Sequence, residues 1–313
     1  MANNMVNSYD QVGRKEDVSD VITNISPTAT PYQTMIGRES IHNIVFSWQE
    51  DSLVSATAGN AVVEGAAAPN ATFNPTVLRT SNTQILQKTA TVSGTADVIS
   101  LYGRDKEMAY QLTMRSKEIK RDLEMSLVGV NAASATGNDT TARTLAPYFK
   151  LVDVTAAGNV WYVGSAGFGG STGTAGPLTE AIILSVSQQL YTNGVDPTTL
   201  MVKPSDALVI SSWQRGTTAF PRTQFMDNGQ KNIVNVVDKY VSPYGELNVV
   251  MNRFQLSNTA YIFDPSYWKL CPLRNWFRYT LGKVGDSTQV QIIGEFGHKH
   301  KNYLASGAVT NIS

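Results

Sequence analysis

Cysteine is almost absent from this sequence, which has Cys271 alone among its 313 residues. No disulfide can therefore form within one chain, and any disulfide would have to join two chains. Secretion and membrane signals are also missing, because the N-terminal residues have no apolar core and no uninterrupted apolar run of about 18 residues occurs. We expect a protein that stays in a cytoplasm or leaves it without a signal, and that does not enter a membrane.

Charge is scarce and balanced. The 25 basic and 25 acidic residues cancel, and charged residues make up only 16% of the chain, against about 25% in ordinary soluble domains. A net charge of zero removes the overall attraction that drives most non-specific binding to nucleic acid. A surface poor in charge favours extensive contacts between proteins, since the cores of interfaces exclude charged side chains. A neutral soluble protein is the plainer alternative.

Several motifs of enzyme and cofactor sites are missing too. H-E-x-x-H does not occur, and the glycine-rich segment 163–177 lacks the spacing and the lysine of a phosphate-binding loop, so we interpret it as a linker. His298 and His300 share one face of a predicted strand, but only Glu295 lies near enough to join them as a metal ligand. We predict no catalytic residue, no cofactor and no metal site.

The first 40 residues are polar and irregular, and we interpret residues 1–40 as an arm. Prolines stiffen it, and a short helix is predicted at residues 31–36, with Thr30 as its cap and Gly37 after its last turn. So short a helix cannot bury its own apolar side chains, so either the core of this chain or a neighbouring molecule must cover them. These side chains are Ile25, Tyr32, Met35 and Ile36.

A long β-hairpin is predicted next. Residues from Ile41 alternate with period two, and a second run rich in β-branched residues spans 76–95. The loop between them, residues 55–72, has Glu64 as its only charge. So long a loop is either a mobile surface loop or a projection that becomes ordered on another subunit.

One amphipathic helix over residues 103–133 is the strongest secondary-structure signal. It would be about 45 Å long at 1.5 Å per residue, with Lys120–Glu124 and Glu118–Arg121 as ion pairs one turn apart. Glu118 and Asp122 share a face, which we interpret as solvated charge and not as an acid/base pair. The predicted apolar face consists of Met108, Leu112, Ile119, Leu123, Leu127 and Val130.

Helices and strands alternate from Leu178 onwards. A helix ending at Gly194 is followed by a strand and a proline-opened helix, then a hairpin about Pro243 and Gly245 and further strands to the end. Arg215, Arg222 and Lys231 flank a loop that is either solvated or a contact between subunits.

The order of these elements resembles the major capsid (head) proteins of tailed bacteriophages with the Hong Kong 97-type fold, in particular a podophage-like major head protein family. The segments that carry the resemblance run from residue 24 to the end, and their order and spacing make it specific. They are NISPTATPYQTMIGR, FSWQEDSL, TQILQKTATVSGT, GRDKEMAYQL, KEIKRDLEMSL, TTARTLA, DPTTLMVKPSD, YGELNVVMNRF and IFDPSYWKL.

The resemblance implies a mixed α+β fold and a structural protein that assembles with copies of itself into the icosahedral or prolate head shell around phage DNA. The rival functions are a virion decoration protein or adhesin, and a hydrolase whose site has no sequence motif. The implied parts are an N-terminal arm (1–40), an extended β-hairpin loop (41–95), a peripheral domain (96–177) with its spine helix at 103–133, an axial domain (178–265) and strands that return to the peripheral domain (266–313).

The resemblance also implies partners and a location. The partners would be further copies in hexamers and pentamers, the portal, and scaffolding or decoration proteins of the same phage, with only weak non-specific contact to packaged DNA. The protein would be assembled in the bacterial cytoplasm and would lie in the virion. As assembly contacts we expect Ile25, Tyr32, Met35, Ile36, Trp48, Glu64, Arg104, Lys117, Arg121, Arg215 and Arg222.

Overall fold

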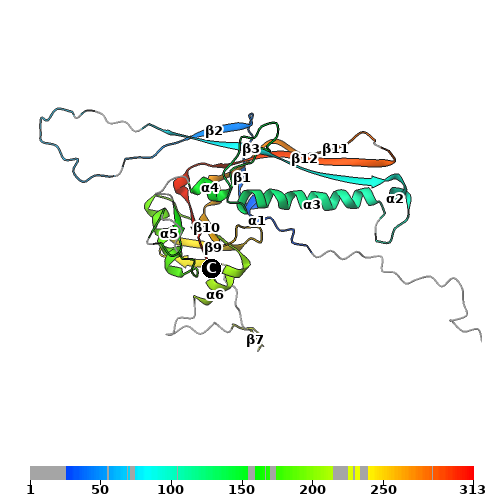
Figure 1. The fold of residues 1–313 in the computed structure, drawn as a ribbon. Coiled ribbons are helices and arrows are strands. Elements are labelled where there is room, and N and C mark those ends of the chain that lie inside the picture. Colours follow the sequence, from blue (N-terminus) through cyan, green and yellow to red (C-terminus); the bar gives the residue numbers. More distant parts are fainter. Residues whose placement is uncertain are drawn as a thin grey trace, which may run out of the picture.

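The computed structural model describes residues 26–313 with short gaps. The gaps are residues 55, 69, 71–74, 104, 154–158, 166, 170–173, 214–224, 228–229, 233–238 and 284. Two sheets and one long helix organise the described part (Figure 1). Among the helices of these residues, none combines the length and the apolar character needed to cross a bilayer.

The first sheet has five strands in the order β1-β11-β12-β3-β2. Its neighbours pair antiparallel, except that β1 runs parallel to β11. The predicted hairpin is confirmed, because β2 pairs with β3 from Val45 opposite Asn82 to Glu50 opposite Val77. The strands are β1 (Gly37–Arg38), β2 (Val45–Glu50), β3 (Val77–Ser93), β11 (Trp268–Thr280) and β12 (Ser287–His300).

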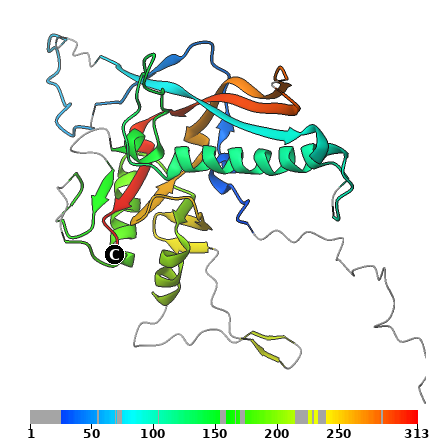
Figure 2. The same ribbon diagram turned by 45° about the vertical axis from the view of Figure 1, so that its right-hand side comes forward.

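Residues 51–76 join β2 to β3, and the described residues of this segment project far from the rest of the fold (Figure 1, left). We call this segment the finger. It leaves the edge of the first sheet in both views (Figure 2). The described residues of the predicted loop therefore lie away from the two sheets and α3 of the same chain.

The long helix α3 (Glu107–Val128) lies along one face of the first sheet. Ile119, Leu123 and Leu127 are buried there, and Lys88 of β3 forms a 2.9 Å ion pair with Asp122. The helix has 22 residues and is therefore about 33 Å long.

The predicted bounds 103–133 were too wide at both ends. Gly103 adopts a left-handed φ of 74°, so the helix cannot extend back through it. At the other end the carbonyl of Val128 accepts hydrogen bonds from the Leu256 amide and the Tyr261 hydroxyl. These two donors satisfy the carbonyl of Val128 at the end of the helix, and the chain does not continue as a helix beyond it.

The second sheet has six strands in the order β4-β13-β10-β5-β9-β8. Helix α5 (Glu180–Thr192) packs on β13, where Gly307 leaves room for it: a Cβ there would meet Val186 Cγ1 at 2.5 Å. Helix α6 (Pro204–Ser212) begins at Pro204 as predicted. The strands are β4 (Val160–Tyr162), β5 (Thr199–Val202), β8 (Lys239–Ser242), β9 (Gly245–Met251), β10 (Thr259–Phe263) and β13 (Ser306–Thr310).

Two strands of this sheet come from segments outside the expected axial domain (178–265). Strand β4 lies within the segment expected to be peripheral (96–177), and β13 lies within the expected return strands (266–313), yet both belong to the second sheet. The physical reason is pairing: β13 aligns antiparallel to β10 over five residue pairs and parallel to β4. The last strand of the chain thus lies inside the second sheet, between β4 and β10.

The remaining elements are short. They are α1 (Pro31–Met35), α2 (Gly94–Val98), α4 (Tyr148–Val152), the 3-10 turns η1 (Pro265–Tyr267) and η2 (Tyr303–Ala305), and a small antiparallel pair of β6 (Phe225–Asp227) and β7 (Gln230–Asn232). A buried aromatic stack fills the junction, with Tyr148 between Tyr261 (4.1 Å between ring centroids) and Trp268 (4.5 Å).

Candidate assembly surfaces

The arm enters the body of the protein at Tyr32, which is fully buried. Its hydroxyl lies 2.7 Å from His298 Nε2. Its ring makes edge contacts with Tyr148, Phe263 and Trp268. Of the two alternatives for covering this segment, the core of the same chain is therefore the one observed.

A buried carboxylate holds the start of α1. Glu124 of α3 accepts hydrogen bonds from the amides of Tyr32 (2.8 Å) and Gln33 (3.1 Å) and from Asn252 Nδ2 (2.7 Å). These amides lie in the first turn of α1, where no intrahelical acceptor is available. Thr30, the predicted cap, makes no capping hydrogen bond. Glu124 caps the start of α1 instead, although it lies 92 residues from Tyr32 in the sequence.

No pattern in the sequence pointed directly to this role of Glu124. Glu124 was expected to form a surface ion pair with Lys120, but it is fully buried. Burial raises the pKa of its carboxyl group, while hydrogen bonds from Gln33, Tyr32 and Asn252 oppose that rise. The available signal was its position beside Leu123, within the buried face of the helix.

These contacts change what the arm residues can do. Tyr32 is 0% and Ile36 is 5% exposed, so neither offers a neighbour a surface, and we reassign both from assembly contacts to internal anchors. Met35 is partly buried against the same core. Ile25 lies outside the described residues.

The finger carries apolar side chains that the described residues leave uncovered. Leu53 is 99%, Val63 81% and Val62 74% exposed. Glu64, expected as a contact, is exposed in a turn that the Ala66 amide closes onto the Val63 carbonyl at 3.0 Å. The left-handed φ of 83° at Gly65 suits that turn.

The base of the finger is fixed within the chain. Trp48 is 8% exposed, stacks on Phe46 and donates from Nε1 to Glu50 at 3.3 Å. Glu50 in turn pairs with Arg79 on the facing strand at 3.1 Å. Trp48, predicted as an assembly contact, therefore braces the hairpin from which the finger projects.

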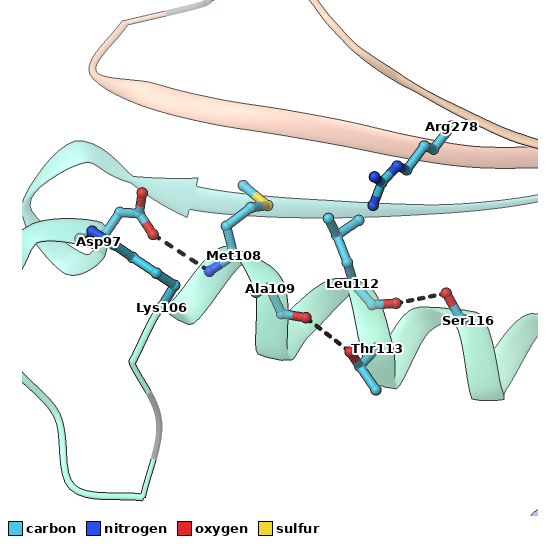
Figure 3. Close-up of a pocket in the computed structure, with 8 residues that line it drawn as sticks. All are labelled: Asp97, Lys106, Met108, Ala109, Leu112, Thr113, Ser116 and Arg278. Atoms are coloured by element: carbon cyan, nitrogen blue, oxygen red, sulfur yellow. Dashed lines mark hydrogen bonds between the residues drawn. The ribbon is translucent and has the colours of Figure 1, made fainter.

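A second apolar group lies at the far end of α3, in the connection from α2. Val98 is 83% and Tyr102 56% exposed, with Ile99 and Leu101 beside them in sequence. Figure 3 shows the adjoining hollow of about 480 Å³, where Arg278 of β11 points toward Leu112 of α3. Asp97 of α2 accepts a hydrogen bond from the Met108 amide there. Apolar side chains such as Met108 and Leu112 and the charged side chains of Asp97, Lys106 and Arg278 thus line the same hollow.

The basic residues predicted as assembly contacts differ in their exposure. Lys117 is exposed on α3, and Arg121 is half-buried with its guanidinium 5.7 Å from the centre of the Phe254 ring. Arg104, Arg215 and Arg222 lie outside the described residues.

His298 and His300 share a face as predicted, but the face is internal. Both rings stack on Trp268, at 4.8 and 3.9 Å between centroids. His298 lies between the Tyr32 hydroxyl and the Ala146 carbonyl, and burial lowers the pKa of His298 to about 4 and of His300 to about 3.

Glu295 does not join these histidines, because side chains three positions apart on a strand point to opposite faces. It forms ion pairs with Arg143 and Arg274 and accepts a hydrogen bond from the Thr83 hydroxyl at 2.7 Å. These contacts tie β12 to β3, β11 and the loop before α4. Within the described residues no group of three side chains could hold a metal ion.

Comparison with known proteins gives one consistent result. The family described as SU10 major capsid protein matches residues 3–313. The major capsid protein of Escherichia phage Phieco32 is 32% identical over 337 residues, which cover 96% of this chain and 95% of that protein.

Solved structures agree on the fold. The Cyanophage A-1(L) capsid subunit superimposes with a TM-score of 0.69 at 10% identity, covering 98% of both chains. The capsid of a native GTA particle gives 0.64 at 9% identity, covering 100% of both chains. At such low identity these two similarities speak for the fold alone, and both are capsids.

Proposed function

The chain belongs to the SU10 major capsid protein family, and on that premise we propose that its copies are joined mainly through the finger. The protein is a structural component and not an enzyme. It forms the head shell of a phage and is located in the capsid of the virion. The proposal concerns how one copy holds the next.

The observation that carries the proposal is the exposure of the finger's apolar side chains. Covering a leucine or valine side chain contributes about 1.5–3 kcal/mol, and Leu53, Val62 and Val63 have no cover within the described chain. A shell repeats each contact many times, so modest contacts add up to a stable particle.

The finger needs a neutral, partly apolar surface on its neighbour, because Glu64 is the only charge between residues 52 and 76. The face of the first sheet opposite α3 offers one. Ile85, Phe277 and Tyr279 are 46%, 42% and 43% exposed there. We propose this face of an adjacent copy as the docking surface.

From the function of the family we also propose where each unit of the subunit lies in the shell and which proteins it contacts. The unit built on the second sheet would lie near the centre of each capsomer, and the unit of α3 and the first sheet at its periphery. Copies would form hexamers and pentamers, with the portal and scaffolding or decoration proteins of the same phage as further partners. Arg104, Arg215 and Arg222 remain proposed contacts between copies.

The test replaces exposed apolar groups of the finger by charge. Leu53→Glu with Val63→Glu should leave the thermal midpoint unchanged, since both side chains are exposed, but should abolish shells in electron micrographs and megadalton species in sedimentation. Ser52→Glu with Asn60→Glu adds the same charge at exposed polar positions of the same segment and should still give shells. Normal shells from the first variant would refute the proposal.

A further inference from the structure

Helix α3 carries equal numbers of acidic and basic residues, but the structure separates them. Glu118 forms a 2.6 Å ion pair with Arg115, and Asp122 forms one with Lys88 of β3. Glu124 is buried against the start of α1. The acidic residues in the second half of the helix are thus engaged within the subunit.

Three basic residues of α3 are not engaged in ion pairs of this kind. Lys117 and Lys120 are exposed, Arg121 is half-buried, and none of the three forms an ion pair within the described residues. Positions three and four apart share one face of a helix, so these cations continue the exposed face marked by Ala109 and Thr113. We call these five residues the basic face.

We propose that the basic face looks into the shell and contacts the phosphate backbone of the packaged DNA. This inference rests on the shell function. Lysine side chains act as flexible point charges and suit phosphates approached without sequence preference. The net charge of zero for the whole chain hides a local excess of positive charge on this helix face.

A protein partner fits the same face less well. Stable protein interfaces bury apolar or aromatic side chains at their centre. The exposed positions of α3 are Ala109, Thr113, Lys117, Lys120 and Met125, so this stripe offers one exposed apolar side chain, Met125 at 46%. The basic face combines small side chains with positive charge. Such a surface suits the evenly spaced phosphates of a nucleic acid better than a peptide that binds through apolar side chains.

Salt dependence provides the measurement. Three phosphate contacts give a slope of about −2.7 for log affinity against log salt, so binding should weaken about 40-fold between 50 and 200 mM salt. The probe is a fluorescent 20-base-pair duplex, titrated with the purified full-length protein. Lys117→Gln with Lys120→Gln should lower the magnitude of the slope by about 1.8.

The matched control is Lys283→Gln with Lys301→Gln, which removes two exposed lysines elsewhere on the surface and should leave the slope unchanged. Equal slopes for the two double variants would overturn the inference. So would preferential displacement of the duplex by polyglutamate at equal charge concentration, which would indicate an acidic protein.

Shell formation separates this inference from the finger proposal. Lys117→Gln with Lys120→Gln should assemble normally and differ only in binding to DNA. If it failed to assemble, the two lysines would be contacts between copies, and the inference would be wrong whatever the finger variants do.

Discussion

The Tyr32 backbone amide donates a 2.8 Å hydrogen bond to the carboxylate of Glu124, which lies 92 residues later in the chain. This bond joins the arm to the long helix. Because Glu124 is buried and also binds Gln33 and Asn252, it sets the point at which the arm leaves the body of the subunit. Four predictions concern the internal contacts of the subunit.

Glu124→Gln should lower the free energy of unfolding by about 2 kcal/mol, since it removes charge-assisted hydrogen bonds at a buried site. Amide hydrogen exchange in α1 should accelerate. The control is Glu118→Gln, which breaks only a partly exposed ion pair with Arg115 and should cost less than about 1 kcal/mol. Equal losses in urea denaturation would contradict the assigned role.

Tyr32 anchors the arm through both its ring and its hydroxyl. Tyr32→Phe should cost about 1 kcal/mol through the lost hydrogen bond to His298, and Tyr32→Ala about 3–5 kcal/mol through the cavity it leaves. Urea denaturation measures both. If the two variants were equally stable, the ring would contribute nothing to anchoring.

Acid should destabilise the subunit through the buried histidines. Burial lowers the pKa of His298 to about 4 and of His300 to about 3, below the ordinary value of about 6.5. The unfolded chain therefore binds more protons than the folded chain below pH 6.5. The stability that neutral histidines contribute is complete above pH 6.5 and is lost as the pH falls toward 4.

Urea denaturation between pH 7 and pH 4.5 measures this loss. His298→Gln should flatten the pH dependence by up to one proton, or about 1.4 kcal/mol per pH unit. His42→Gln removes an exposed histidine and should leave the curve unchanged. An unaltered slope in His298→Gln would contradict the prediction.

Cys271 should be unreactive in the folded protein. Burial, with a smaller contribution from Glu39, raises the pKa of its thiol to about 12, and the thiolate is the reactive form. A chromogenic thiol reagent at pH 8 should react slowly with the native subunit and rapidly in denaturant. The control is Ser52→Cys, which places a second thiol at an exposed position and should react rapidly in the native subunit. Non-reducing gels should show no disulfide-linked dimers of the native sequence.

Several elements could be predicted because their signals are local. The period-two pattern after Ile41 predicted the hairpin, and Gly194 and Pro204 marked the end of α5 and the start of α6, all confirmed. The helix α3 was confirmed in type but not in length, because its last carbonyl binds Tyr261 and Leu256, which are far away in sequence.

The placement of the contact residues was harder to predict. Tyr32 and Trp48 are apolar residues beside exposed segments, and sequence pattern alone cannot tell a buried anchor from an uncovered contact. Glu124 was assigned to solvent, since charged residues in amphipathic helices ordinarily lie there. Its burial depends on amides that only the folded arm brings to it.

By itself the sequence determined the order of strands and helices, the scarcity of charge and the family, since each of these depends on residue type and spacing along the chain. The tertiary structure alone decided which strands share a sheet, that Tyr32 is internal, and that Lys117, Lys120 and Arg121 of α3 are left without an ion pair among the described residues. The physical reason is that burial and pairing of charge depend on groups distant in sequence, and only folding brings those groups within hydrogen-bonding distance.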